Sequence, residues 1–181
     1  MNHKIMLEFS FIVFLIFSFS SQSQAEIKEL KYGSFSFEQE LTLPGSPNEI
    51  YDAISGDISG WWDHSFSEHP YKFYIEAKPG GGFYEIFNDA GDGVKHATVI
   101  VADRGKMLRF DGPLGLSGMA IQVVTTYTFK PVGNDSTQLN LSVHAAGELK
   151  DGLPAIVENV WHHFLFEQFK PYIEEGKHLK K

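Results

Sequence analysis

Glu85, His96 and Arg109 are the residues whose types could move a proton or orient a polar group of a ligand. Glu85 alternates with Phe83 and Phe87 along one predicted strand, and Arg109 lies on a later strand. If these side chains face an apolar interior, they would have shifted pKa values and could act in acid–base catalysis. If they face solvent, Glu85 and Arg109 would form a cross-strand charge pair worth under about 1 kcal/mol. Charged side chains are rarely buried, so we expect the solvent-facing arrangement.

Other side chains that could do chemistry do not occur in a recognised arrangement. The chain has eight histidines, but His64 and His69 are five residues apart on a predicted loop, which is not a chelating spacing. Periodicity places His144 and His162 toward solvent. The chain also lacks cysteine, a Gly-x-Ser-x-Gly nucleophile motif, a phosphate-binding loop and a dinucleotide-binding fingerprint. We therefore expect neither a metal ion nor a cofactor.

The composition is that of a single acidic domain. The 181 residues carry a formal net charge of -8 at pH 7. Nucleic acid and anionic membrane surfaces require a basic face on the protein, so we expect neither as a partner. The chain has no cysteine and so forms no disulfides. A chain of this length can bury enough apolar surface to be stable without them.

Residues 1–25 have the three-part pattern of a secretory signal peptide. A basic start at Lys4 precedes an apolar run from Phe9 to Phe19, and small residues lead to Ala25. The alternative is a membrane anchor, but the run is shorter than the ~20 residues that a span requires. We predict cleavage after Ala25, export to the periplasm or the medium, and no stable membrane anchor after processing. The expected organisation is then a leader over 26–33, one domain over 34–176 and a basic tail over 177–181.

The domain is expected to consist mainly of strands joined by tight turns. Alternating apolar residues predict a strand over 34–43, and the capping-box pattern of Ser46 and Glu49 predicts a short helix after it. A second short helix is predicted over 57–62. Six further strands are predicted over 71–77, 83–87, 94–102, 106–111, 119–129 and 137–145. About seven strands connected in this way form an antiparallel sheet that wraps on itself.

Two further segments have distinct patterns. From Leu153 to Lys170 the apolar residues recur at helical spacing and predict a long terminal helix, which Pro171 should kink or end. Residues 112–118 contain Pro113 and three glycines and predict a mobile loop.

Five short stretches and the order of elements resemble a known family. The stretches are Pro47-Asn48-Glu49-Ile50-Tyr51-Asp52-Ala53-Ile54, Trp61-Trp62, Pro79-Gly80-Gly81-Gly82-Phe83, the strand from Arg104 to Phe110, and Thr137-Gln138-Leu139-Asn140-Leu141. Together they resemble the START-related (SRPBCC, helix-grip) superfamily, most closely the branch named after the activator of Hsp90 ATPase, over about Ser34 to Glu175. The resemblance implies an α+β fold. In it, a curved antiparallel sheet wraps around a long C-terminal helix, and two short helices follow the first strand.

The resemblance also implies an apolar cavity between the sheet and the terminal helix. Its candidate ligand-binding residues are Trp61, Trp62, Phe83, Phe87, Tyr127, Phe129, Trp161 and Phe164. One tryptophan of the adjacent pair would face the cavity while the other covers its opening; alternatively, both rings fill the end of the core. The loop over 112–118 is expected to act as a moving gate.

These features favour an exported protein that binds a small hydrophobic or lipid-like molecule. Two alternatives remain open. One is a cyclase-like or hydrolase-like enzyme that uses Glu85, Arg109 or His96 in the same cavity. The other is a protein-interaction module of the Hsp90-activator kind, against which the signal peptide argues because that chaperone is cytosolic. The sequence predicts no oligomeric state.

Overall fold

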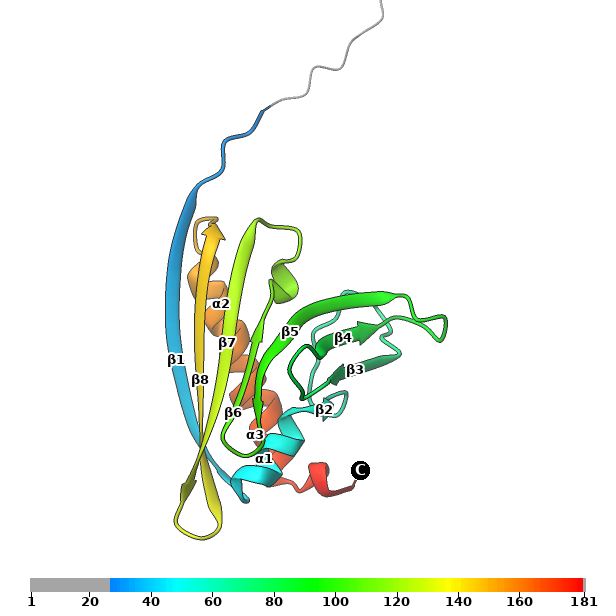
Figure 1. Ribbon diagram of the computed structural model, residues 1–181, viewed down its shortest axis with the longest axis vertical. Coiled ribbons are helices and arrows are strands. Elements are labelled where there is room, and N and C mark those ends of the chain that lie inside the picture. Colours follow the sequence, from blue (N-terminus) through cyan, green and yellow to red (C-terminus); the bar gives the residue numbers. More distant parts are fainter. Residues whose placement is uncertain (1–26, 181) are drawn as a thin grey trace, which may run out of the picture.

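One antiparallel sheet curves around the C-terminal helix in the computed structural model, which describes residues 27–180 (Figure 1). The predicted signal peptide lies outside these residues. The strands are β1 (Tyr32–Pro44), β2 (Gly56–Asp57), β3 (Lys72–Ile75), β4 (Gly82–Ile86), β5 (Gly93–Asp103), β6 (Met107–Asp111), β7 (Ile121–Val132) and β8 (Ser136–Glu148). Their spatial order is β1-β8-β7-β6-β5-β4-β3-β2. The predicted α+β helix-grip fold is therefore confirmed, with one strand more than expected.

The inner face of the sheet forms the core. Leu139 on β8 pairs with Leu41 on β1 and with Phe129 on β7, and all three side chains are buried. The register shifts between Phe83 and Tyr84, and again where β5 pairs with β6. Such irregularities bend a strand and increase its twist. The β2–β4 part of the sheet consequently turns away from the long strands, as Figure 1 shows.

The helix α1 (Pro47–Ile54) is confirmed together with its capping box. The Ser46 hydroxyl accepts from the Glu49 N–H, and the Glu49 carboxylate accepts from the Ser46 N–H. The second short helix, predicted over 57–62, is wrong. Residues 56–57 instead pair with β3, and a single turn follows in which the Trp62 N–H donates to the Ile58 carbonyl. Pairing with a distant strand satisfies the backbone here, so a helix has no advantage.

The terminal helix runs unbroken through α2 (Leu153–His162), the π-helical segment η2 (His163–Phe169) and α3 (Lys170–Glu174). Pro171, which was predicted to kink or end the helix, does not end it. The Lys170 N–H donates to the Leu165 carbonyl, five residues back, so the helix is widened immediately before the proline. Proline lacks an N–H and its ring crowds the preceding turn, and a π-to-α transition accommodates both.

Two 3-10 turns complete the described chain, η1 (Leu114–Leu116) and η3 (Lys177–Lys180). Among residues 27–180, no helix combines the length and the apolar character that crossing a membrane requires.

Candidate ligand cavity

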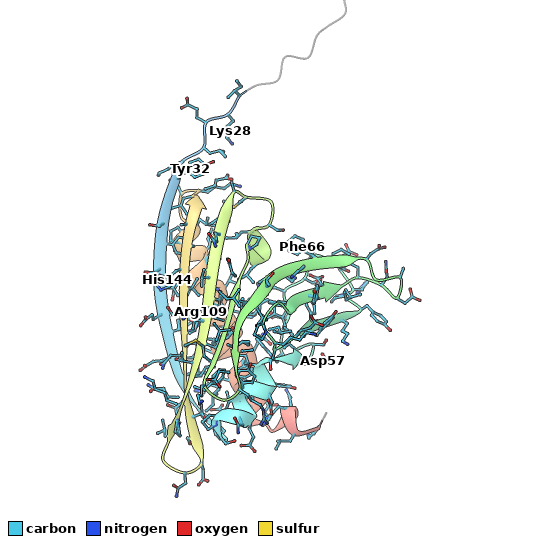
Figure 2. The ribbon with its side chains drawn as sticks, in the orientation of Figure 1. Lys28, Tyr32, Asp57, Phe66, Arg109 and His144 are labelled. Atoms are coloured by element: carbon cyan, nitrogen blue, oxygen red, sulfur yellow. The ribbon has the colours of Figure 1, made fainter. Side chains whose placement is uncertain are left out.

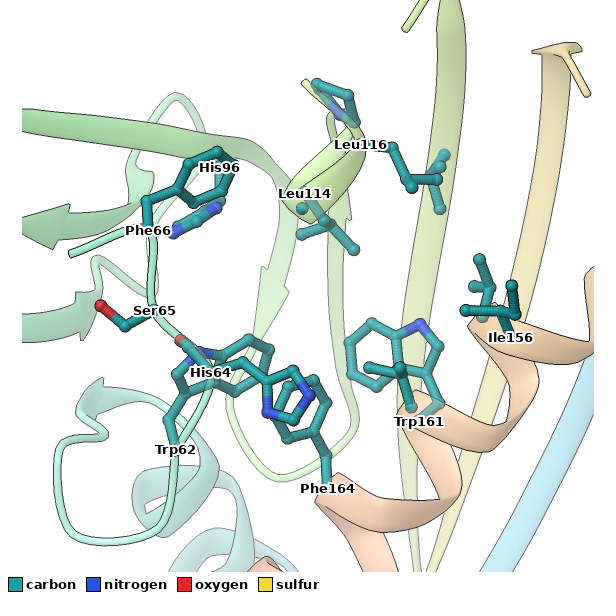
Figure 3. A pocket seen from close by; sticks show the side chains of 15 residues that line it. Trp62, His64, Ser65, Phe66, His96, Leu114, Leu116, Ile156, Trp161 and Phe164 are labelled. Carbon is teal, nitrogen blue, oxygen red and sulfur yellow. The ribbon is translucent and has the colours of Figure 1, made fainter. Parts of the chain in front are cut away.

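A cavity of about 370 Å³ lies between α2, η1 and the segment over 62–66 that follows β2 (Figure 3). Its lining is largely apolar. The aliphatic and indole side chains that form most of its wall are Leu114, Leu116, Val123, Ile156, Val160 and Trp161. The polar side chains among its lining residues are His64, Ser65 and His96. Small-molecule sites have this combination of an apolar wall and a few polar groups.

The adjacent tryptophans have different environments. Trp61 is buried in the core, with its ring edge-on to Phe169 at 4.9 Å between centroids. Trp62 lines the cavity and stacks on Phe164 at 3.8 Å, with its edge against Phe83 at 4.9 Å. One ring therefore belongs to the core and the other to the cavity wall.

The other predicted ligand-binding residues are divided in the same way. Trp161 and Phe164 line the cavity, whereas Phe83 lies behind Trp62. Tyr127 and Phe129 are buried outside the lining, and Phe87 is half-buried and also outside it. Burial raises the pKa of Tyr127, so its hydroxyl stays protonated.

Glu85 is fully buried, which contradicts the expectation that it faces solvent. Its carboxylate accepts from the N–H groups of Phe66 and Ser67 at 3.0 Å and from the Ser65 hydroxyl at 2.5 Å. Burial would raise the pKa of Glu85, but these hydrogen bonds and the nearby His96 hold the pKa below its ordinary value. Glu85 is therefore an anion that fastens residues 65–67 to β4.

His96 lines the cavity, alone among the three catalytic candidates. Its ring lies 4.9 Å from that of Phe83 and 5.6 Å from that of Phe66, between centroids. His96 Nε2 lies 3.3 Å from Glu85 Oε2, without the geometry of a hydrogen bond. Burial lowers the pKa of His96, against the opposing effects of Glu85 and of a backbone hydrogen bond with Leu114. The imidazole is therefore neutral at pH 7.

Arg109 lies on the outer face of the sheet, away from the cavity (Figure 2). Its Nε donates to the Thr126 hydroxyl across β6 and β7 at 2.8 Å. The expected charge pair with Glu85 is wrong because the two side chains are on opposite faces of the sheet. No site chemistry in the cavity involves Arg109.

Residues 112–118, the predicted gate, cover one side of the cavity through η1. A Cβ on Gly112 would lie 2.5 Å from both Ala97 Cα and the His96 carbonyl oxygen, so only glycine permits this approach to β5. Leu114 has a φ of 53°, in the left-handed region that leucine rarely adopts. The sequence indicated a flexible segment, but it did not indicate that Leu114 and Leu116 would face the cavity.

Residues 64–66 were not predicted as part of the site. Their placement depends on the buried Glu85 carboxylate, which binds the backbone of this segment. Strand alternation placed Phe83 and Glu85 on one face, and the apolar Phe83 was the available signal that this face is the inner one.

This architecture is the helix-grip fold, as the resemblance implied. Solved structures share it. The Aha1 dimer from Colwellia psychrerythraea has a TM-score of 0.55 and 20% identity, over 79% of this chain and 98% of that chain. SA2116 from Staphylococcus aureus, a protein of unknown function, has a TM-score of 0.56 and 13% identity, over 81% and 98%. A protein from Rhizobium leguminosarum has a TM-score of 0.57 and 13% identity, over 82% and 99%.

At these identities the similarity is one of fold. No protein-family model matches the chain, and no curated protein matches its sequence.

Proposed function

We propose that this protein is an exported carrier or receptor that binds a small hydrophobic or lipid-like molecule between α2 and η1. The observation that carries the proposal is the cavity of about 370 Å³, whose wall is mainly aliphatic and aromatic. Apolar burial contributes about 25 cal/mol per Å² before the cost of ordering the ligand. An apolar ligand would therefore gain affinity from Val160, Trp161 and Leu114, while His64, Ser65 and His96 orient any polar group.

Binding can be tested with the apolar fluorophore N-phenyl-1-naphthylamine. Val160 lines the cavity, so Val160→Trp would occupy part of its volume. We expect this variant to weaken probe binding by about tenfold or more, a loss of at least ~1.4 kcal/mol. The control is Val132→Trp, which adds the same ring at a position that is 44% exposed at the end of β7. Equal affinity in the two variants would contradict the proposal.

Export is a separate part of the proposal and rests on the pattern of residues 1–25. N-terminal sequencing of the protein recovered outside the cytoplasm is expected to begin at Glu26. Replacing Ala25 with arginine should block processing, since signal peptidase reads a small residue there. A chain that retains residues 1–25 and stays in the cytoplasm would contradict export without affecting the cavity.

An enzyme acting in the same cavity is the second candidate, and His96 favours it. A neutral imidazole in an apolar wall can accept a proton from a bound substrate. Glu85 is not available for this role because the segment over 65–67 occupies its oxygens. His96→Gln should abolish turnover and leave probe binding in place if catalysis occurs, whereas a pure carrier has no turnover to lose.

A further inference from the structure

Among residues 27–180, one group of side chains brings metal-binding donor atoms together, at the edge of the cavity where His64 lies. One donor atom each from Asp63, His64 and His163 lie within 4.8 Å of one another. Asp63 Oδ2 lies 2.7 Å from His163 Nε2, and Asp63 Oδ1 lies 2.9 Å from His64 Nδ1. His163 begins η2, a hundred residues along the chain from Asp63, so the fold rather than local spacing assembles the group.

We propose that Asp63, His64 and His163 form a binding site for a divalent transition-metal ion of the zinc type. Imidazole nitrogens and a carboxylate suit this class of ion, and three protein ligands leave a coordination position open for water or another ligand. In a tetrahedral site with bonds of about 2.0–2.1 Å, ligand atoms lie roughly 3.3 Å apart. The two separations from Asp63, 2.7 Å to His163 Nε2 and 2.9 Å to His64 Nδ1, are shorter than that value, so the side chains must rotate to move the donor atoms apart when an ion binds.

The surroundings of His163 orient it for coordination. Its Nδ1 lies 2.8 Å from Glu167 Oε2, one helical turn further along. A carboxylate on one ring nitrogen fixes the tautomer that leaves the other nitrogen free to bind a metal, and most metal-bound histidines have such a partner. Here that nitrogen is Nε2, which is hydrogen-bonded to Asp63 Oδ2 in this structure and would exchange that contact for the ion. The two carboxylates also give the group a negative charge that attracts a dication.

The chain around Asp63 and His64 is held in place before any ion binds. The Trp62 Nε1–H donates to the His64 carbonyl at 2.8 Å, and the Trp62 ring stacks on Phe164. The His64 ring also packs edge-on against the Phe164 ring, with 4.7 Å between the centroids. Phe164 follows His163 directly, so one packed cluster fixes both halves of the site. Preorganised ligands of this kind favour binding.

The sequence alone predicts no metal site, because His64 and His69 on the same loop are not at a chelating spacing. His64 also lines the cavity, but an ion can bind to Asp63, His64 and His163 whether or not the cavity is filled. The side chains of Asp63 and His64 are 40% and 51% exposed, which gives an ion a path from solvent.

The test is a calorimetric titration of the purified protein, prepared without a histidine tag, with Zn²⁺ at neutral pH in a buffer that does not chelate metal. We expect one ion per chain. His163→Ala and Asp63→Asn should each abolish binding or weaken it by about 100-fold, and Glu167→Gln should weaken it by about 10–100-fold. His69→Ala is the matched control: it removes an exposed histidine of the same loop and should leave the affinity unchanged.

Substitution of Co²⁺ gives a second readout. Its visible absorption should show coordination by nitrogen and oxygen in the wild-type protein and in His69→Ala, and not in His163→Ala. Circular dichroism of each apo variant checks that it is folded, and Asp63→Asn preserves shape if His163→Ala does not fold. The absence of stoichiometric Zn²⁺ binding, or equal affinity in Asp63→Asn and His69→Ala, would overturn the proposal.

Discussion

His96 Nε2 lies 3.3 Å from the Oε2 atom of Glu85, and both side chains are buried on the inner face of the sheet. The two groups have different tasks. Glu85 binds the backbone over 65–67, and His96 presents its ring to the cavity. Residues 65 and 66 line the cavity, and the ionised Glu85 carboxylate holds them in place through hydrogen bonds. The ionisation of Glu85 therefore affects the position of this part of the cavity wall.

Glu85→Gln should destabilise the protein although the side chain keeps its size. The amide has one acceptor oxygen where the carboxylate has two, and it loses the charge that strengthens three hydrogen bonds. We expect a loss of about 1–3 kcal/mol in the free energy of unfolding, measured with urea. Glu38→Gln, at an exposed position on β1, should change stability by under about 0.5 kcal/mol. A similar decrease in the free energy of unfolding in both variants would show that the Glu85 hydrogen bonds do not stabilise the protein.

Stability should fall in two steps as the pH decreases. The pKa of His96 is lowered from 6.5 in the folded protein, and that of Glu85 is lowered from 4.5. At a pH below the ordinary pKa of each group, the unfolded chain binds a proton that the folded protein does not bind. The free energy of unfolding therefore decreases as the pH falls from the ordinary pKa toward the lower pKa of the folded protein.

Urea unfolding across this range measures both steps. His96→Gln should remove the step that begins near 6.5, and Glu85→Gln should reduce the step that begins near 4.5, to which Glu49 also contributes. A stability profile that is flat between these two values in the wild-type protein would contradict the role given to His96.

Gly112 does not line the cavity, but Gly112→Ala should shift η1, which does. The added methyl group would meet Ala97 Cα and the His96 carbonyl oxygen, both at 2.5 Å, and backbone atoms cannot move aside cheaply. We expect destabilisation of about 1–3 kcal/mol and weaker binding of the fluorophore as η1 shifts. Gly115→Ala lies in the same segment with no atom within 4 Å of the new Cβ, so its melting temperature should stay near that of the wild type. The opposite ranking would mean that η1 is not positioned by this close approach.

The adjacent tryptophans should respond differently to truncation. Trp61→Ala removes a core ring and should cost about 3–5 kcal/mol of stability. Trp62→Ala removes a half-buried ring from the cavity wall, so we expect a smaller loss of stability and a larger loss of fluorophore affinity. Thermal unfolding and fluorescence titration of both variants measure the contrast. If Trp61→Ala weakens binding more while remaining folded, the assignment of the two rings is reversed.

Local signals in the sequence were sufficient for much of this architecture. Alternation identified β1, β7 and β8, and the Ser46–Glu49 capping box located α1. Tertiary pairing could not be anticipated, and it replaced the helix predicted over 57–62 with β2. The helix continues past Pro171 because of the π-helical hydrogen bonding before it, which has no established short-range sequence pattern.

The site was harder to predict than the fold because its parts meet only in three dimensions. Tyr127 and Phe129 have the right alternation for a cavity wall, yet they pack into the core. Glu85 is charged, and its buried position depends on N–H donors from Phe66 and Ser67 that have no periodicity. His163 meets Asp63 from a hundred residues away.

Native mass spectrometry of the purified wild-type protein and of Val160→Trp tests the central claim most directly. We predict that the wild-type protein carries a bound apolar molecule, seen as a defined mass above that of the chain, and that the variant carries less of it or none. If the wild-type protein is free of any such molecule and remains so after incubation with lipid extracts, the cavity between α2 and η1 is not a binding site.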